Sequence, residues 1–409
     1  MDLKTTKSQL INKCLITGKE TTKILDLGMH PYADTFITED QLNFSEPVFP
    51  LQVNMNSESG QIQLGYISND SDRYNLYSYS YTSSNSKFAR NHWDSYFKNI
   101  KNKYKIEGIN VLEIGSNDGY LTEKFIGNDN YVLGIDSSKT MCDIAHSRGI
   151  DTISELFSWD LSNKISSFGA KETSFDIIIA NNVFNHANNP LDFAKGVENI
   201  LSDEGLFIFE LPYWGSTIQS GKFDQIYHEH ISYFTLKSTQ TLLNKVGLKV
   251  VDCELVDYHG GSIRVQAKKS GDVSSRVLDF ETMENKLNLF DPKTYVTFQK
   301  SIIEKRNIFM KELYDLKISG ATIIGVGAAA KANTFLNYYN IDNSLLEYIT
   351  DSSKHKQNKY TPLTRIPIVG DEIFSEYDEV YALILSWNIS TNLKKILHNI
   401  NPKIKFITL

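Results

Sequence analysis

Hydrophobic residues along the middle of this chain recur in short continuous runs that alternate with stretches of helical spacing. The runs at 111–114, 131–136 and 175–180 are apolar at nearly every position, which is typical of strands buried on both faces of a sheet. Each run ends in glycine or in polar residues. Strands that alternate with helices predict a doubly wound, mostly parallel sheet between residue 103 and about residue 270.

The pattern differs on either side of this sheet. Residues 1–75 predict a small β-rich module, because short apolar segments are separated there by Gly, Asn and Ser. The segment that follows the sheet carries charges at helical spacing around Leu, Phe and Ile and predicts a helical connector. A second α/β pattern then begins with the apolar run and glycine turn at 321–327. The expected domains are 1–75, 76–270, 271–318 and 319–409.

Composition narrows the classes of protein that the chain can belong to. A chain of 409 residues, 41% of them hydrophobic, can bury the cores of two or three domains. A net charge of −7 gives no electrostatic reason to expect a nucleic-acid partner. No apolar run approaches the roughly 18 residues of a membrane span, and a signal-peptide pattern is missing. We therefore expect a soluble, cytoplasmic protein without a membrane partner, either a monomer or a dimer.

The most informative segment is VLEIGSNDGYL at 111–121, where a buried strand runs into a glycine turn. Gly115 and Gly119 have the spacing G-x-x-x-G, and a helix is expected directly after them. Backbone N–H groups at the mouth of a parallel sheet are a common site for a small cofactor. Glu113 and Asp118 would repel a pyrophosphate, so a cationic cofactor without phosphate suits this turn better. The segment looks like the first motif of class I S-adenosylmethionine (SAM) methyltransferases.

Two further strand ends belong to the same predicted crevice. The run YVLGID ends in Asp136, about twenty residues after the first motif, where a carboxylate can accept both ribose hydroxyls of an adenosine. The run FDIIIANN ends in two asparagines at the same edge of the sheet. The residues expected to bind the cofactor are Glu113, Gly115, Ser116, Asn117, Asp118, Gly119, Asp136, Ser137 and Asn181.

The densest group of titratable side chains lies in FDQIYHEHISYF at 223–234. In an extended segment, Tyr227 and Glu229 would face one way, and His228 and His230 the other. A histidine beside a carboxylate that fixes its tautomer is a general-base arrangement. Two alternatives remain: a structural aromatic cluster, and a metal site, which would need at least a third ligand besides His-x-His.

Other segments carry candidate chemistry with weaker signals. The loop after the third strand contains Asn182 and His186, at the place where class I methyltransferases hold substrate-facing residues. HGGSIR forms either a hairpin turn or an anion-contacting loop through Arg264. GVGAAAK forms either an anion site near Lys331 or a turn whose glycines serve only close packing. A segment dense in Tyr and Ser is either a linker or a wall of aromatic side chains that includes Tyr81.

Taken together, these segments resemble the sugar C-methyltransferases that act on nucleotide-activated keto-deoxysugars in bacterial glycan and antibiotic pathways. The resemblance is collinear over nearly the whole chain. It runs through LGMHPYADTF (27–36), YSYTSSNS (79–86), VLEIGSNDGYL (111–121), ANNVFNHANNP (180–190), FDQIYHEHISYF (223–234), HGGSIRV (259–265), GVGAAAKANTFLNY (325–338), KYTPLTRIPIV (359–369) and LSWNI (385–389). It implies a zinc-binding N-terminal module, a class I SAM methyltransferase (Rossmann-like) core and a Rossmann-like C-terminal α/β domain.

The resemblance also implies roles for individual residues. His230 matches the family's general base, which removes a proton next to a sugar ketone so that the resulting enolate attacks the methyl group of SAM. The expected catalytic residues are His230, Glu229, Tyr227, Tyr81, His186 and Asn182. The expected substrate-binding residues are His228, Tyr233, Arg264 and Lys331. O- or N-methylation of a nucleotide sugar, and a non-catalytic nucleotide-sugar binding protein, are the alternatives.

One departure from the family concerns the zinc site. The family's N-terminal module carries two Cys-x-x-Cys pairs, whereas this chain keeps only Cys14 of the first pair. Thr17 replaces its partner, and Asn56 and Ser59 stand in place of the second pair. One thiol cannot substitute for a four-ligand zinc site, so we expect no structural zinc and a module held by its packing.

Overall fold

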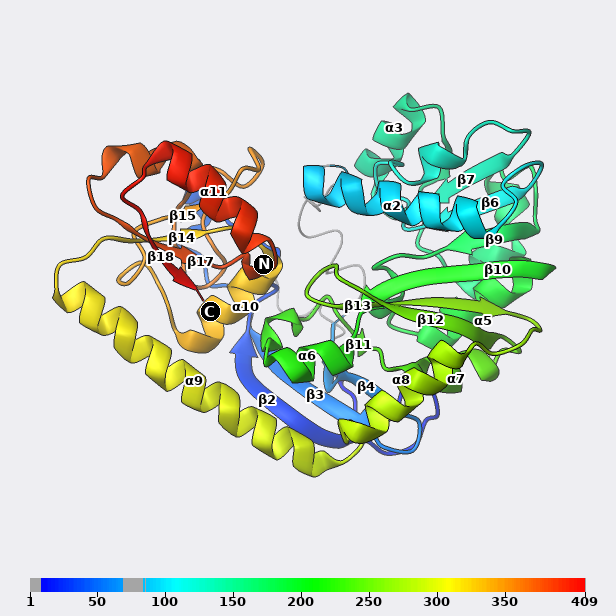
Figure 1. Ribbon diagram of the computed structural model, residues 1–409, viewed down its shortest axis with the longest axis horizontal. Coiled ribbons are helices and arrows are strands. Elements are labelled where there is room, and N and C mark those ends of the chain that lie inside the picture. The colour runs from blue at the N-terminus through cyan, green and yellow to red at the C-terminus, as the bar shows by residue number, and fades with distance from the viewer. Residues whose placement is uncertain (1–8, 69–83, 85, 409) are drawn as a thin grey trace.

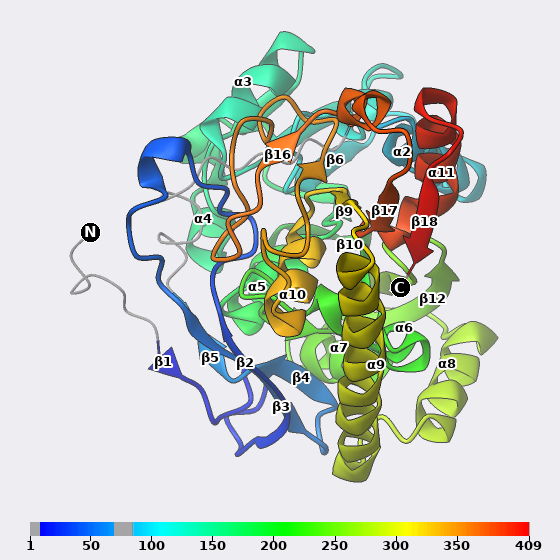
Figure 2. The same cartoon turned by 90° about the vertical axis from the view of Figure 1, so that its left-hand side faces the viewer.

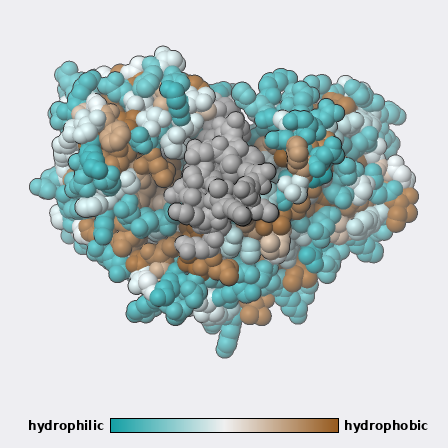
Figure 3. All heavy atoms as spheres, turned by 180° about the vertical axis from the view of Figure 1, so that it is seen from behind, coloured by the Kyte–Doolittle hydropathy of each residue, from teal (hydrophilic) through white to brown (hydrophobic). Residues whose placement is uncertain are grey.

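A computed structural model describes residues 9–68, 84 and 86–408 (Figure 1). The central domain forms one lobe, and the C-terminal domain forms the other, with the N-terminal strands and the long helix α9 along the bottom of the view. Hydrophilic side chains cover the outer edges of both lobes on the opposite face (Figure 3). Among the described residues, no helix is long and apolar enough to cross a membrane.

The central domain is built on a seven-stranded sheet with the order β12-β13-β10-β9-β6-β7-β8. Its strands are β6 (Asn110–Ile114), β7 (Tyr131–Ile135), β8 (Asp151–Ile153), β9 (Phe175–Ile179), β10 (Leu201–Pro212), β12 (Lys249–Val256) and β13 (Ser262–Lys268). The five strands from β10 to β8 are parallel, and β13 runs antiparallel to both of its neighbours. This is the doubly wound α/β sheet that the apolar runs predict.

Helices cover both faces of this sheet because each carries one apolar stripe. In α2, buried Ala89, Trp93, Tyr96 and Ile100 follow one another at helical spacing, and the Ser86 side chain caps the first turn. The other helices of the domain are α3 (Lys139–Ser147), α4 (Trp159–Asn163), α5 (Pro190–Ile200), α6 (Trp214–Ser220) and α7 (Leu236–Asn244), and α2 itself spans Lys87–Lys103. The helix expected after the glycine turn is only the short 3₁₀ helix η2 (Thr122–Phe125).

The sheet of the N-terminal module has four antiparallel strands, and the strand at one edge comes from the central domain. The order is β11-β4-β3-β2, and β11 lies near the end of the histidine-rich segment at 223–234 of the central domain. The strands are β2 (Thr22–His30), β3 (Phe49–Asn56), β4 (Gln61–Leu64) and β11 (Ser232–Tyr233), with a separate pair of β1 (Gln9–Leu10) and β5 (Tyr66–Ile67). The module is therefore tied by backbone hydrogen bonds to the segment that carries the candidate base.

Hydrogen bonds connect three of the four positions where the related family has zinc ligands. The Cys14 sulfur lies 3.4 Å from the Ser59 hydroxyl, which donates to the Asn56 side chain at 2.8 Å. The Asn56 amide donates in turn to the Glu20 carbonyl oxygen at 2.9 Å. A hydrogen-bond cluster thus joins the loops of the module.

The C-terminal domain follows two connecting helices, α8 (Ser275–Lys286) and α9 (Pro292–Ile318). Its parallel sheet has the order β16-β15-β14-β17-β18. The elements are β14 (Ile323–Val326), α10 (Ala330–Tyr339), β15 (Ile349–Thr350), β16 (Ile368–Val369), η6 (Asp371–Glu376), β17 (Tyr381–Ile384), η7 (Trp387–Ile389), α11 (Ser390–Ile400) and β18 (Lys405–Thr408).

One hydrophobic core runs through all three domains. It includes Val53 of the N-terminal sheet, Trp214 of the central domain, Tyr295 of α9 and Ile349 of the C-terminal sheet. Trp214 and Tyr295 also share a hydrogen bond of 2.9 Å. Figure 2 shows α9 beside the N-terminal strands and α10. Because the core is shared, the three domains form one packed body around their common junction.

Candidate active site

Both glycines of the first motif are required by close packing. Gly115 has φ = 71°, and a Cβ there would lie 2.0 Å from a Val183 methyl carbon. Gly119 has φ = 77°, and its Cβ would lie 2.3 Å from Ile150. A larger residue at either position would meet both backbone strain and a steric clash. The turn therefore lies directly against the loop after β9 and the end of α3.

Acidic side chains converge on this turn. Asp136 accepts hydrogen bonds from the backbone N–H groups of Asn117 (2.9 Å) and Ser138 (2.8 Å). Burial raises the pKa of Asp136. Burial, together with the nearby charges of Asp118 and Asp136, raises the pKa of Glu113 to about 8, although a hydrogen bond from Thr122 opposes this rise. A carboxyl group with a pKa of about 8 is mostly protonated at neutral pH, so Glu113 adds little of the negative charge that the sequence analysis expected at this turn.

Asp118 has a partner that the sequence analysis missed. It is completely buried, and its carboxylate lies 3.2 Å from the guanidinium of Arg148. It also accepts a hydrogen bond from the Ser84 hydroxyl. Arg148 is thirty residues further along the chain, at the end of α3, and no spacing rule connects it to the first motif. The ion pair fixes the turn against α3.

The remaining residues predicted for the cofactor lie along the same edge of the sheet. Ser116 is buried, and its hydroxyl has no hydrogen-bond partner among the residues that the structure describes. Ser137 is exposed at the rim after β7, and Asn181 lies near the end of β9. β6 lies between β7 and β9, where the strand order reverses, which is the usual crevice for a ligand in such a sheet. These groups fit a positively charged cofactor that carries hydroxyls.

The histidine-rich segment at 223–234 forms a turn around Tyr227–His230 and not the extended strand that the sequence analysis considered. The 3₁₀ helix η5 (Phe223–Gln225) opens the segment, and the N–H of His230 donates to the Tyr227 carbonyl at 3.0 Å. This turn places Tyr227 and His230 on the same side, whereas an extended strand would have separated them. The Tyr227 hydroxyl lies 2.6 Å from Nε2 of His230.

A backbone carbonyl fixes the tautomer of His230. Nδ1 lies 3.0 Å from the Gln225 carbonyl oxygen, which can only accept, so Nδ1 carries the proton. Nε2 then has the lone pair and accepts from the Tyr227 hydroxyl. Glu229 was expected to orient the imidazole, but one of its oxygens accepts from the backbone N–H groups of Ala33 (3.1 Å) and Asp34 (3.2 Å). Because Gln225 acts through its backbone, no side-chain pattern could reveal it.

The surroundings of His230 keep its imidazole neutral. Burial lowers its pKa well below the usual value, and the positive potential of His186, Lys331 and His259 lowers it further. The rings of His186 and His230 are perpendicular, with centroids 5.0 Å apart. A neutral imidazole with its lone pair on Nε2 is in the form that can accept a proton, and here the Tyr227 hydroxyl donates to that lone pair.

The structure brings the loop after β9 against His230. The 3₁₀ helix η4 (Phe184–His186) carries His186, and the Asn185 carbonyl accepts from the N–H of Ile231 at 2.8 Å. Asn182 begins the loop with φ = 54°, and its N–H donates to the Glu210 carbonyl at 2.8 Å. The loop therefore connects the cofactor edge of the sheet with His230.

The C-terminal domain holds the same segment from the other side. The Thr334 hydroxyl donates to the Ile226 carbonyl at 3.1 Å, and Trp387 Nε1 donates to Asp224 at 2.5 Å. The Lys331 ammonium donates to the His259 carbonyl at 3.1 Å. Sequence analysis missed Thr334, Trp387 and Asp224, although each lies in a stretch that carries the family resemblance. All three domains meet at the base.

Two residues expected to bind substrate face elsewhere. His228 is buried against the N-terminal module, with ring contacts to Tyr32 and Phe49. Tyr233 lies in β11 and packs on Trp214. The turn separates His228 from His230, whose ring lies against His186 instead, so the two imidazoles have different surroundings. Within the described part of the chain, no group of three or more His, Cys, Asp or Glu side chains is placed to hold a metal.

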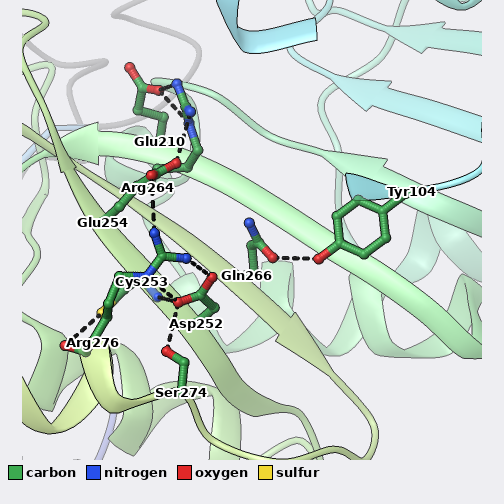
Figure 4. Close-up of polar contacts among 9 residues, drawn as sticks. All are labelled: Tyr104, Glu210, Asp252, Cys253, Glu254, Arg264, Gln266, Ser274 and Arg276. Carbon is green, nitrogen blue, oxygen red and sulfur yellow. Dashed lines mark hydrogen bonds and ion pairs between the residues drawn. The ribbon is translucent and has the colours of Figure 1, made fainter. Parts of the chain in front are cut away.

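The predicted anion contact of Arg264 is also wrong. Arg264 lies on β13 and donates twice to Glu210, at 3.0 and 2.8 Å, and once to Glu254 at 3.0 Å (Figure 4). Its guanidinium also lies over the ring of Tyr96, 4.4 Å from the centroid. The guanidinium is therefore paired with two carboxylates of the chain and does not serve as an anion contact. The HGGSIR segment is a hairpin turn between β12 and β13.

Close packing explains the glycine turn of the C-terminal domain. A Cβ on Gly327 would lie 2.0 Å from the Ser386 hydroxyl. The next N–H group, that of Ala328, donates to Asp351 at 2.9 Å. The Asp351 carboxylate therefore occupies the position in which the sequence analysis allowed an external anion. Tyr81, the remaining predicted catalytic residue, lies outside the described residues.

Family models match three successive parts of the chain. Residues 14–74 match a model described as a zinc-binding domain, residues 88–252 match a methyltransferase domain, and residues 257–408 match a C-methyltransferase C-terminal domain. The chain is 27% identical over 399 residues to the C-methyltransferase NovU of Streptomyces niveus, covering 95% of this chain and 94% of NovU.

Solved structures resemble part of this chain. Magnesium protoporphyrin IX methyltransferase of Synechocystis PCC 6803, solved with S-adenosylhomocysteine, is 14% identical with a TM-score of 0.36, covering 44% of this chain and 83% of its own. A SAM-dependent methyltransferase of Aquifex aeolicus is 18% identical with a TM-score of 0.33, covering 42% and 87%. The order of the three matched domains and the near full-length similarity to NovU carry the assignment. The chain is a SAM-dependent C-methyltransferase.

Proposed function

We propose that this enzyme methylates the carbon next to the ketone of a nucleotide-activated keto-deoxysugar, with His230 as the general base. The observation that carries the proposal is the state of His230: buried, neutral and oriented by Gln225 so that Nε2 has a lone pair. The carbon next to a ketone is acidic enough for such a base when the enolate oxygen is stabilised.

Several side chains around His230 have separate roles in the proposed reaction. Nε2 of His230 accepts the proton, and the pair of electrons from the C–H bond moves into the enolate. The Tyr227 hydroxyl, 2.6 Å from Nε2, shields the lone pair until substrate replaces it, and then becomes a donor for the enolate oxygen. His186 and Asn182 line the side nearest the cofactor edge. SAM, when bound, supplies the electrophilic methyl group.

Asp136 provides a test of the cofactor site. Asp136→Ala should weaken SAM binding by roughly 1–3 kcal/mol, because two hydrogen bonds from ribose hydroxyls to a partly buried carboxylate are lost. Asp136→Asn, which keeps the shape and part of the acceptor capacity, should have a smaller effect. Isothermal titration calorimetry measures both. Equal affinity of wild type and Asp136→Ala would remove Asp136 from the site.

The pH dependence of kcat/KM tests whether nearby positive charges lower the pKa of His230. Because the pKa of His230 is lowered, kcat/KM should fall on the acid side only well below pH 6.5. Lys331→Met removes one of the charges that lower this pKa, so the acid limb should move to higher pH. Lys395→Met, an exposed lysine on α11, is the control and should leave the profile in place. An unchanged midpoint in Lys331→Met would contradict this role of Lys331.

Isotope exchange tests the reaction itself. Enzyme and a nucleotide-activated 4-keto-6-deoxysugar in D₂O, without SAM, should exchange one C–H next to the ketone, because proton removal precedes methyl transfer. With SAM, NMR of the product should show the new methyl group on that carbon. A methyl group on oxygen or nitrogen would establish the alternative reaction. Neither exchange nor methylation across a set of nucleotide sugars would favour a binding protein.

A further inference from the structure

The C-terminal domain holds the two residues on either side of Gln225. Before Gln225 in the chain, the Asp224 side chain accepts from the indole N–H of Trp387 at 2.5 Å. After it, the Ile226 carbonyl accepts from the Thr334 hydroxyl at 3.1 Å. The Gln225 carbonyl itself accepts from Nδ1 of the candidate base. The group that fixes the tautomer of the base therefore lies between two contacts made by another domain.

These contacts are shielded from water. Asp224 is 4% exposed, Gln225 1% and Thr334 2%. Breaking a buried hydrogen bond leaves both of its polar groups without a substitute, so such a bond fixes the positions of its partners. The side-chain amide of Gln225 adds a further contact, because it donates to the Thr217 hydroxyl of α6 at 3.4 Å. A shift of the backbone at 224–226 therefore breaks several buried hydrogen bonds.

The ring of Trp387 is itself confined by its neighbours. The ammonium groups of Lys222 and Lys331 lie 4.9 and 5.4 Å from its centroid. A Cβ on Gly260, in the hairpin between β12 and β13, would lie 2.2 Å from the indole. The hairpin thus packs directly against the ring, and cation–π attraction adds to this packing. These contacts keep the indole N–H directed at Asp224.

The far end of the turn is connected to the same helix of the C-terminal domain. Helix α10 packs against both η5 and β2, at the junction of the lobes (Figure 1). Asn333 of α10 is buried and donates to the Ala33 carbonyl at 2.5 Å. The N–H groups of Ala33 and Asp34 donate in turn to Glu229. Helix α10 therefore contacts the base segment directly through Thr334 and also contacts the loop that binds Glu229.

We propose that the C-terminal domain positions the general base of this enzyme through Trp387 and Thr334. By fixing the backbone at 224–226, these two side chains keep the Gln225 carbonyl within hydrogen-bond distance of Nδ1 of His230. Nε2 then retains the lone pair that accepts the proton. Both side chains act through Gln225, so both are positioning residues. The inference rests on the proposed function, because it requires His230 as the base.

Small displacements of the base have large kinetic consequences. A misplacement of about 1 Å can cost about 10²-fold in rate, even when the reacting group is chemically intact. If the Gln225 carbonyl moves away, Nδ1 of His230 loses its acceptor. The proton can then move to Nε2, which removes the lone pair. The C-terminal domain thereby controls the rate of proton removal rather than the affinity for SAM.

Variants that remove one hydrogen bond and keep the packing test this role in the full-length enzyme. Trp387→Phe removes the indole N–H, and Thr334→Val removes the hydroxyl with little change in shape. With a nucleotide-activated 4-keto-6-deoxysugar, each should lower kcat by about tenfold or more and keep the KM for SAM within about twofold of wild type. Thr334→Ser restores the hydroxyl and should recover most of the lost rate.

Heteronuclear NMR of selectively labelled histidine side chains gives a readout that loss of stability alone does not change. In the wild type, the His230 proton should lie on Nδ1, and the fraction with the proton on Nε2 should rise in Trp387→Phe and Thr334→Val. Thr239→Val is the matched control, because Thr239 is fully buried and its hydroxyl donates to the Thr235 carbonyl of its own helix at 2.8 Å. It should lower the melting temperature but leave the His230 signals as in wild type.

The possible outcomes separate positioning from stability and from the reaction. Identical His230 signals in wild type, Trp387→Phe and Thr334→Val would overturn the proposal. A Thr239→Val enzyme that loses as much kcat as Thr334→Val would also overturn it, because loss of stability would then explain both. If one of the two positioning variants fails to fold, the other decides. The NMR measurement needs no substrate, so it can support the positioning role even if product analysis finds the methyl group on oxygen or nitrogen.

Discussion

Replacing His230 by alanine should lower the rate of methylation by about 10²–10⁴-fold, the usual contribution of a general base. Hydrogen–deuterium exchange next to the sugar ketone should fall to the same extent, because both processes begin with proton removal. SAM affinity should stay nearly unchanged, since His230 lies beside Gln225 and Tyr227 rather than at the glycine turn. Single-turnover kinetics and NMR exchange measure the two effects separately.

Two neighbouring histidines provide controls for this result. His228→Ala alters a side chain that packs on Tyr32 and Phe49, so it should reduce stability but leave exchange per folded molecule close to wild type. His186→Gln should lower the rate less than His230→Ala does, because His186 acts on the base as a neighbouring ring. A His230→Ala enzyme that methylates at the wild-type rate would place the base elsewhere, with His186 as the next candidate.

The sequence could predict the sheet and the cofactor turn because both depend on local patterns. Buried parallel strands need continuous apolar runs, and the close approach of Val183 and Ile150 to the turn requires glycine at 115 and 119. The carboxylate of Asp136 follows its strand directly, so its position at the edge of the sheet came from the same pattern. These inferences needed no knowledge of which distant residues pack together.

The geometry of the base could not be predicted in the same way. Alternation along 223–234 assumed an extended strand, whereas a 3₁₀ helix and a turn bring Tyr227 onto His230. The orienting group is the carbonyl of Gln225, which every residue type possesses. Thr334 lies more than one hundred residues away in the chain, so only the tertiary fold connects its hydroxyl with Ile226.

Arg264 shows why a residue type alone is an uncertain guide to a site. An arginine after a glycine turn suggests an anion contact, but β10 and β12 each place a glutamate beside β13 at that register. Glu210 pairs with Arg264 across one side and Glu254 across the other. Cross-strand neighbours follow from strand order, which a hydrophobic pattern does not give. The guanidinium therefore stabilises the central sheet through ion pairs with both neighbouring strands.

Arg264→Met should destabilise the central domain by about 3–5 kcal/mol, because it leaves the carboxylate of Glu210 buried without its cation. Arg264 is 6% exposed and the side chain of Glu210 is fully buried, so water cannot replace the lost partner. Nε2 of His92 also lies 2.8 Å from Glu210. Urea unfolding followed by circular dichroism measures the change.

Arg276→Met is the matched control, because the same substitution breaks a more exposed ion pair nearby (Figure 4). The side chain of Arg276 is 42% exposed and pairs with Asp252, so its loss should cost only about 0–1 kcal/mol. A double variant, Glu210→Gln with Arg264→Met, removes the buried charge and should regain part of the stability. Equal effects of Arg264→Met and Arg276→Met would show that the buried pair contributes no more than the surface one.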